Sequence, residues 1–225
     1  MINIFKKKEE KINVRLGDDC IVDSAKVAEV NNSEVYIFIG RSGCGKGTQV
    51  ELFNKELEKN GSKILHIETG VFFREFIKGD FFIQKLSKSV VETGGLMPEA
   101  IVVGLWVNYL VNNFTGKENI VFDGAPRKYQ EAVLLDGTLN FMGIKKYKVI
   151  HINTSRKWAT ERLLARGRKD DTKEGVAKRM HWYDTEVMKS IKFFKNNKNA
   201  KFIDVNGEQT IEEVSKELIS KVFKK

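Results

Sequence analysis

The chain has 225 residues, and 39 basic side chains outnumber 30 acidic ones, which gives a formal net charge of +9. This length suits one α/β domain that needs no disulfide or metal to fold, because about 70% of the unfolded surface can be buried. Cys20 and Cys44 provide neither a disulfide framework nor a zinc quartet, and no apolar run reaches the ~20 residues of a membrane span. The excess charge fits a lysine-rich surface, since no nucleic-acid motif accompanies it. We expect a reduced, cytoplasmic protein with no membrane or nucleic-acid partner.

Residues 1–34 precede the first clear strand, and they form an extension whose role the sequence does not define. Within it, Gly17, Asp18 and Asp19 are suited to the turn of a short hairpin. The apolar residues nearby favour packing of residues 11–30 on a sheet edge, and the alternative is a tail that makes no such contact.

From residue 35 to residue 225, short apolar runs alternate with longer segments of helical period. The runs are apolar almost throughout, which is typical of parallel strands covered on both faces. The alternation predicts a three-layer α/β/α domain with a five-stranded parallel sheet. The expected strands are Val35–Gly40, Lys63–Glu68, Asn119–Asp123, Lys148–Asn153 and Lys201–Val205, and the expected helices are Lys46–Lys59, Phe81–Thr93, Pro98–Asn112, Tyr129–Phe141, Ser155–Arg166, Thr172–Lys195 and Thr210–Phe223.

The stretch GRSGCGKGTQ, which follows the first strand, has the spacing of a phosphate-binding loop. Gly40, Gly43 and Gly45 allow the backbone to curl so that successive N–H groups point inward. The next helix adds the positive end of its dipole, and Lys46 can reach the β- and γ-phosphates of a nucleotide. The sequence therefore predicts a nucleotide phosphate site here.

Two residues of this loop carry further expectations. Gly47 stands where Ser or Thr is usual, and the hydroxyl is displaced to Thr48. Cys44 lies inside the loop, where amides and Lys46 should favour its thiolate and where an adduct should block ATP.

The order G-K-G-T-Q resembles the loop of the adenylate kinase and nucleoside monophosphate kinase family. Further segments that resemble this family follow in the right order, so the resemblance extends from Val35 to the C-terminus. It implies a P-loop NTPase fold with a helical monophosphate-binding insert at about 69–98 and a very short lid at about 162–172.

Two segments resemble the part of the family that holds the acceptor nucleotide. In IETGVFFREF, Thr69, Gly70 and Arg74 match the pattern T-G-[DE]-x-x-R, while Val71 replaces an acid. Arg74 would pair bidentately with the acceptor phosphate. In GGLMP, the backbone near Met97 would meet the acceptor base.

The segment DGAPR resembles the family signature D-G-[FY]-P-R after the third strand. Asp123 would hold Mg²⁺ through its water shell, and Arg127 would be a second phosphate clamp. The family carries a base-reading Gln four residues past this Arg. Here Glu131 occupies that position, and Gln130 lies one residue earlier.

An arginine-rich segment from residue 161 to 180 resembles the family's lid. Asp170 and Asp171 would orient the arginines, and Asp171 with Glu174 has the spacing of an N-cap and capping box. Long lids in this family can carry zinc-binding cysteines, whereas this lid is short and no zinc is expected. The lid arginines are Arg162, Arg166, Arg168 and Arg179.

The resemblance implies reversible phosphoryl transfer from MgATP to AMP, which gives two ADP, with Mg²⁺ near Thr48 and Asp123. The implied catalytic residues are Lys46, Arg127, Arg162, Arg168 and Arg179. The implied ATP-binding residues are Gly43, Cys44, Gly45, Lys46, Gly47, Thr48, Arg162 and Arg166, and the AMP-binding residues are Thr69, Gly70, Arg74, Met97, Gly124, Arg127, Gln130, Arg168 and Arg179.

Two alternatives remain open from the sequence. A UMP/CMP kinase usually has Ala where Thr69 stands, so Thr69 favours AMP, but the displaced Gln130 leaves the base undecided. An ATP-binding regulatory protein without activity would need neither Arg74 nor Arg127. The oligomeric state is undetermined, with a slight preference for a monomer.

Overall fold

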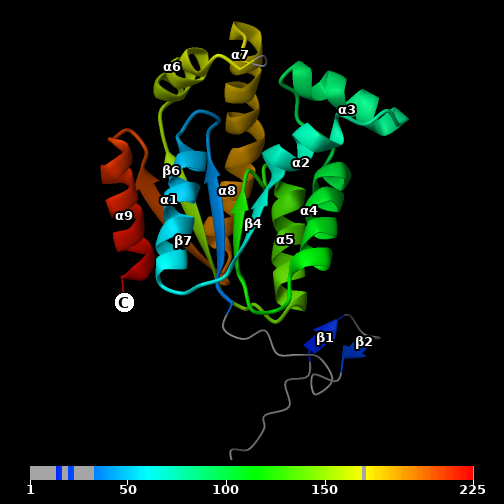
Figure 1. The fold of residues 1–225 in the computed structure, drawn as a ribbon, viewed down its shortest axis with the longest axis vertical. Coiled ribbons are helices and arrows are strands. Elements are labelled where there is room, and N and C mark those ends of the chain that lie inside the picture. The colour runs from blue at the N-terminus through cyan, green and yellow to red at the C-terminus, as the bar shows by residue number, and fades with distance from the viewer. Residues whose placement is uncertain (1–13, 17–19, 23–32, 169–170, 225) are drawn as a thin grey trace, which may run out of the picture.

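The computed structural model describes residues 14–16, 20–22, 33–168 and 171–224. Its main sheet has five parallel strands in the order β4–β5–β3–β6–β7, which confirms the predicted sheet (Figure 1). The strands are β3 (Val35–Gly40), β4 (Ile64–Glu68), β5 (Asn119–Asp123), β6 (Tyr147–Asn153) and β7 (Ala200–Asn206).

Helices cover both faces of the sheet (Figure 1). α1 and α9 lie on one face, whereas α4, α5 and α8 lie on the other. α2 and α3 belong to a helical arm, residues 69–98, and α3 extends away from the sheet (Figure 1). The helices are α1 (Lys46–Lys59), α2 (Thr69–Phe76), α3 (Phe82–Glu92), α4 (Glu99–Asn113), α5 (Tyr129–Phe141), α6 (Arg156–Arg166), α7 (Lys173–Trp182), α8 (Met188–Asn196) and α9 (Ile211–Phe223).

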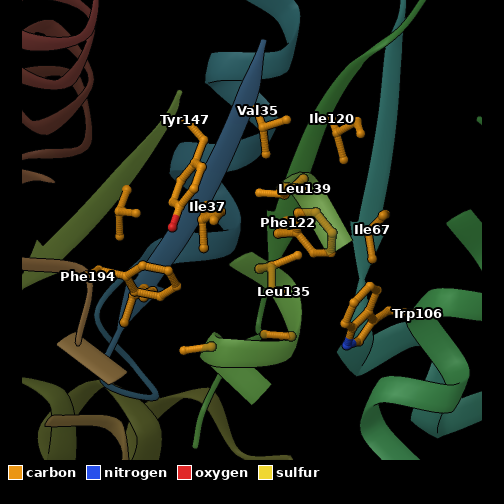
Figure 2. Packing of buried hydrophobic residues seen from close by; sticks show 14 of the residues in the cluster. Val35, Ile37, Ile67, Trp106, Ile120, Phe122, Leu135, Leu139, Tyr147 and Phe194 are labelled. Carbon is orange, nitrogen blue, oxygen red and sulfur yellow. The ribbon is translucent and has the colours of Figure 1, made fainter. Parts of the chain in front are cut away.

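Alternation along the central strand β3 divides the apolar core into two layers. Val35 and Ile37 face the layer that contains Trp106, Leu135 and Phe194, and Figure 2 shows these side chains packed together. Tyr36 and Phe38 face the opposite layer, where Phe53 of α1 contacts both rings edge-on. All of these side chains are buried, so both faces of β3 are covered as its continuous apolar run predicts.

Two helix predictions differ from the structure. The expected helix Thr172–Lys195 is α7, then a π-helical stretch, Tyr183–Val187 (η2), and then α8. α2 was not expected, since it is only eight residues long and no side chain caps its N-terminus. Short helices without caps leave little trace in a sequence, because tertiary packing supplies most of their stability.

In the N-terminal extension, β1 (Val14–Leu16) and β2 (Cys20–Val22) pair antiparallel, in agreement with the predicted hairpin. The turn at 17–19 and the expected packing of residues 11–30 lie outside the described residues. In the part of the chain that the structure describes, every helix is too short or too polar to span a bilayer.

Candidate active site

The phosphate loop joins the end of β3 to α1, at the carboxyl edge of the sheet. Gly45 precedes the helix with φ of 84°, and Gly43 has φ of 85°, so both adopt the left-handed conformation that favours glycine. A Cβ at Gly43 would lie 2.5 Å from the carbonyl oxygen of Ala159. The first turn of α1 contains no acidic residue. The N–H groups at the start of α1 and the helix dipole therefore suit an anion, which is the role that the loop sequence predicts.

Lys46 and Asp123 lie together at the mouth of this loop. The Lys46 Nζ is 3.7 Å from the Asp123 Oδ1, and Asp123 is buried at the end of β5. A Cβ at Gly47 would be 3.9 Å from the Asp123 Oδ2, so only a small residue keeps this side of the carboxylate open. Thr48 is exposed on the first turn of α1.

The expectation for Cys44 is wrong in one respect. Burial raises the pKa of the Cys44 thiol, and the nearby Lys46 charge does not outweigh this effect. Cys44 is packed into the core under the loop, where its Sγ would be 2.7 Å from a Cβ at Gly40. The side chain is therefore a structural thiol rather than a reactive thiolate.

A second group of predicted residues lies at the ends of β4 and β5. Thr69 is buried at the start of α2, and its Oγ1 donates to the carbonyl oxygen of Asp123 at 3.3 Å. Gly124 has φ of 86°, and a Cβ there would lie 2.7 Å from the Thr69 Oγ1. This close approach explains why glycine follows Asp123. Arg74 extends from α2 and pairs with Glu68 at 3.1 Å.

Arg127 occupies the space between these two strand ends and α7. Its Nε donates to the carbonyl oxygen of Gly124 at 2.8 Å, and its Cζ lies 5.5 Å from the centre of the Trp182 ring. Its backbone N–H donates to the Glu131 Oε2 at 2.7 Å. Burial lowers the pKa of Arg127, while the charges of Glu131 and Asp123 oppose that shift. A guanidinium stays charged in this setting, so Arg127 is a fixed cation just after β5.

Gln130 and Glu131 lie in different surroundings. Glu131 is only 2% exposed and is directed toward Arg127, whereas Gln130 is exposed and lines an open cavity of about 910 Å³ with residues of α8. Burial raises the pKa of Glu131 despite the Arg127 N–H and charge. The structure therefore brings Glu131, and not Gln130, together with Arg127. Met97 is buried in the same core layer as α4.

One carboxylate holds the side chains of two lid arginines, Arg166 and Arg179. The side chain of Asp171 has no exposed surface, and it accepts two bonds of 2.8 Å from Arg166 and one of 2.6 Å from Arg179. The Arg168 N–H donates to it at 3.1 Å. Burial would raise the pKa of Asp171, but the bonds from Arg166 and the Arg168 N–H outweigh it and hold the pKa below its usual range. Asp171 therefore orients the arginines as predicted, while Asp170 lies outside the described residues.

The rest of the lid includes the side chains of two further arginines, a glycine turn and the cap of α7. Arg162 stacks on Trp158, with 4.4 Å between its Cζ and the ring centre, and Arg168 is exposed. Gly167 ends α6 with φ of 69°. The predicted cap of the next helix is wrong, because Thr172 caps α7 by accepting from the Gly175 N–H at 3.0 Å. Asp171 is committed to the arginines and is not available for that role.

A known protein family matches most of this chain. Residues 38–199 match the family model described as "Adenylate kinase". The chain belongs to the adenylate kinase family. It is 32% identical to "Adenylate kinase 1" of Nostoc sp., over 81% of this chain and 95% of that protein. It is also 32% identical to "Adenylate kinase" of Oenococcus oeni, over 80% of this chain and 93% of that protein. It is 33% identical to "Adenylate kinase" of Nautilia profundicola, over 82% of this chain and 94% of that protein.

As an adenylate kinase, the chain has a suitable place for Mg²⁺. Carboxylate and hydroxyl oxygens are the ligands this cation prefers, and it usually keeps several waters of its own. The Asp123 carboxylate and the Thr48 hydroxyl fit this chemistry at the mouth of the phosphate loop. Among the described residues, no group of three His, Cys, Asp or Glu side chains could hold a metal ion by itself. A cation held here would therefore rely on nucleotide phosphates and water.

Sequence reasoning missed two residues of this adenylate kinase site. Arg41, in the phosphate loop, donates to the Thr154 carbonyl oxygen at 3.1 Å and stacks 4.0 Å from the centre of the Tyr183 ring. Trp182, at the end of α7, faces Arg127. Arg41 has a signal in the sequence, since it stands inside the loop motif. Trp182 has none, because its partners come from distant segments.

Proposed function

We propose that this chain transfers the γ-phosphoryl group of ATP to AMP and so forms two ADP. One observation carries the proposal: two cationic sites flank Asp123. Lys46 of the phosphate loop lies 3.7 Å from one side of its carboxylate, and Arg127 is bonded to the carbonyl oxygen of the next residue, Gly124. A protein that binds one nucleotide needs only the first of these sites.

The donor side is formed by residues that follow β3 and β6. The loop amides would cradle the β- and γ-phosphates, and Lys46 would neutralise their charge. Arg162 and Arg166 come from α6, which packs against Gly43 of the loop. Thr48 and Asp123 would hold Mg²⁺ through water, and when bound that cation would neutralise charge on the β- and γ-oxygens. The loop residues of this side are Gly43, Cys44, Gly45, Lys46, Gly47 and Thr48.

The acceptor side is formed by residues that follow β4 and β5. Arg74 and Arg127 would hold the AMP phosphate bidentately, with Thr69 and Gly70 beside it. Arg168 and Arg179, on the far side of the site, would face the phosphoryl group in transfer. An AMP oxygen attacks the γ-phosphorus, the bond from that phosphorus to the bridging oxygen breaks, and the bridging oxygen leaves on ADP. The attacking oxygen is already anionic, so no general base is required.

For the base of the acceptor nucleotide, the structure supports a second candidate beside adenine. Glu131 is the acid in the buried position next to Arg127, where a base of the acceptor would be read. A carboxylate only accepts hydrogen bonds, whereas an amide both accepts and donates. Glu131 thus favours bases that present an amino group, which adenine and cytosine do and uracil does not. CMP is the second candidate acceptor on this ground.

The experiment that tests the proposal measures ADP formation with MgATP and, in turn, AMP, CMP, UMP and dTMP. We expect AMP to give the highest kcat/KM. Arg127→Ala should lower kcat/KM for AMP by on the order of 10³-fold, as for other positioned arginines in phosphoryl transfer, and should leave the Kd for ATP nearly unchanged. Arg156→Ala is the matched control, because Arg156 is an exposed arginine whose ion pair with Asp184 spans 3.5 Å and is open to water. Wild-type turnover in Arg127→Ala, or no turnover with any monophosphate, would contradict the proposal.

A further inference from the structure

Trp182 contacts two parts of the acceptor site from a helix that belongs to neither of them. Its indole Nε1–H donates to the carbonyl oxygen of Gly94 at 3.2 Å. The face of its ring lies 5.5 Å from the Cζ of Arg127. Trp182 is the last residue of α7, which also carries Arg179. One side chain therefore touches the helical arm, the proposed phosphate clamp and the helix that follows the lid.

The contact with Gly94 is placed at the end of the arm. α3 ends at Glu92, and Gly94 then turns the chain with φ of 70°. A Cβ at Gly94 would lie 3.1 Å from both the Cα and the carbonyl oxygen of Gly175 in α7. Two glycines thus let the backbone of the arm rest directly on α7, and the indole hydrogen bond fixes the same point. The root of the arm is attached to α7 rather than to the sheet alone.

The contact with Arg127 bears on the aim of its guanidinium. The Arg127 Nε donates to the Gly124 carbonyl oxygen. The guanidinium can then turn only about this hydrogen bond, and the plane of the group sets the direction of its remaining N–H groups. An aromatic face attracts a guanidinium without occupying the N–H edge that binds phosphate. Trp182 offers such a face, while Glu131 holds the Arg127 backbone from the other end.

We propose that Trp182 is a positioning residue of the acceptor site, which orients Arg127 and ties the end of the arm at Gly94 to α7, the helix that follows the lid. The inference rests on the proposed function, since it assigns Trp182 a role in holding the acceptor monophosphate. It extends that function, because Trp182, which lies outside the phosphate-binding segments, sets the orientation of Arg127 in one of those segments.

The simplest rival is that Trp182 only fills space next to the core. Trp106, which is 1% exposed and packs edge-on against Phe122, is a tryptophan of that kind. Trp182 is only partly buried, and it borders a shallow surface cavity together with Gly94 and Gly95. The two readings differ in what they predict for the affinities of the two substrates.

The test compares Trp182→Phe and Trp182→Leu with wild type in KM for AMP, KM for ATP, kcat and thermal midpoint. Trp182→Leu removes both contacts, and we expect KM for AMP to rise about 10-fold, as loss of a partly desolvated cation–π contact implies. Trp182→Phe keeps a ring over Arg127 and loses only the indole N–H, so the rise should be about 3-fold. KM for ATP should change less than 2-fold in both variants. Phe141→Leu, which truncates an exposed aromatic side chain at the end of α5, is the control and should change neither KM.

A double-mutant cycle decides whether Trp182 acts through Arg127. If it does, Trp182→Leu in an Arg127→Ala background should add less than 3-fold to the loss in kcat/KM for AMP. Full additivity, or equal rises in the two KM values, would overturn the inference and leave the proposed function intact. A wild-type protein that does not phosphorylate AMP would overturn both. Trp182→Phe keeps most of the side-chain volume, so if Trp182→Leu fails to fold the two KM values and the cycle with Arg127→Ala are measured with Trp182→Phe, where a rise in KM for AMP alone is still expected.

Discussion

Asp171 offers a sharp test of how the lid is held. Its carboxylate has no exposed surface and accepts bonds from Arg166, Arg179 and the Arg168 N–H. Asp171→Asn keeps the shape but removes the charge and turns one acceptor oxygen into a donor. Breaking a buried ion pair by loss of one partner costs about 3–5 kcal/mol. Arg166 is 34% exposed and so stays partly solvated, which brings our expectation to about 2–3 kcal/mol.

Asp184→Asn is a matched control for this prediction. Asp184 also accepts from two arginines, Arg41 at 2.6 Å and Arg156 at 3.5 Å, but its side chain is 40% exposed. Ion pairs of this kind contribute about 1 kcal/mol or less, since water screens them. Urea denaturation should therefore give a free energy of unfolding that falls at least twice as far in Asp171→Asn as in Asp184→Asn.

Turnover should respond to the same change. Without the carboxylate, Arg166 and Arg179 repel each other and lose their fixed positions. A misplacement of about 1 Å can cost on the order of 10²-fold in rate, and we expect a loss of that size in kcat for ADP formation. The pKa of Asp171 is lowered in the folded state, so its stabilisation is complete above the unfolded value of about 3.9 and is lost as pH falls through the folded value. Equal losses of stability in the two variants, or unchanged kcat in Asp171→Asn, would refute this reasoning.

Three further outcomes are expected. Gly167→Val should lower kcat for ADP formation, because a β-branched residue at φ of 69° strains the turn that joins α6 to the lid. Wild-type kcat in this variant would contradict a role for that turn in turnover. Cys44 should be alkylated slowly, since burial raises the pKa of its thiol, and bound MgATP should slow the labelling further. Equal labelling rates with and without MgATP would count against the place of Cys44 under the loop. The stability of Glu131→Gln relative to wild type should increase as pH rises above ~4.3, because the raised pKa of Glu131 means that the unfolded chain ionises first and the folded state is disfavoured until the pH passes the folded pKa. A pH-independent difference would contradict this.

The sheet and the phosphate loop could be predicted because their signals are local. β3 is an uninterrupted apolar run, and Gly43 and Gly45 stand where the loop needs a left-handed backbone. The Asp171 network was predictable in part, since acids beside clustered arginines favour pairing. Its capping role was predicted wrongly, because Asp171 and Thr172 are both good N-caps and only the buried arginines decide between them.

Other features depend on contacts that no local pattern contains. The thiol pKa of Cys44 follows from its depth under the loop, not from the lysine two residues away. The orientation of Glu131 and Gln130 depends on where α5 begins, and a shift of one residue turns a helix side chain by about 100°. Trp182 meets Gly94 across 88 positions of sequence.

The strand order has a consequence for how substrate choice can change. Because β3 is central, the proposed acceptor clamps Arg74 and Arg127 follow strands on the β4–β5 side, whereas Arg162 and Arg166 follow β6 on the other side. Exchanging residues 60–141 for those of a relative would therefore replace both of these clamps, together with Asp123, while the phosphate loop and the lid arginines stay native. Trp182 would remain with the host in such a chimera, since it belongs to the other half of the chain. The grafted segment then fits only if it provides both contacts of Trp182. These are a carbonyl oxygen at the position of Gly94 for the indole N–H and an arginine at the position of Arg127 against the face of the ring.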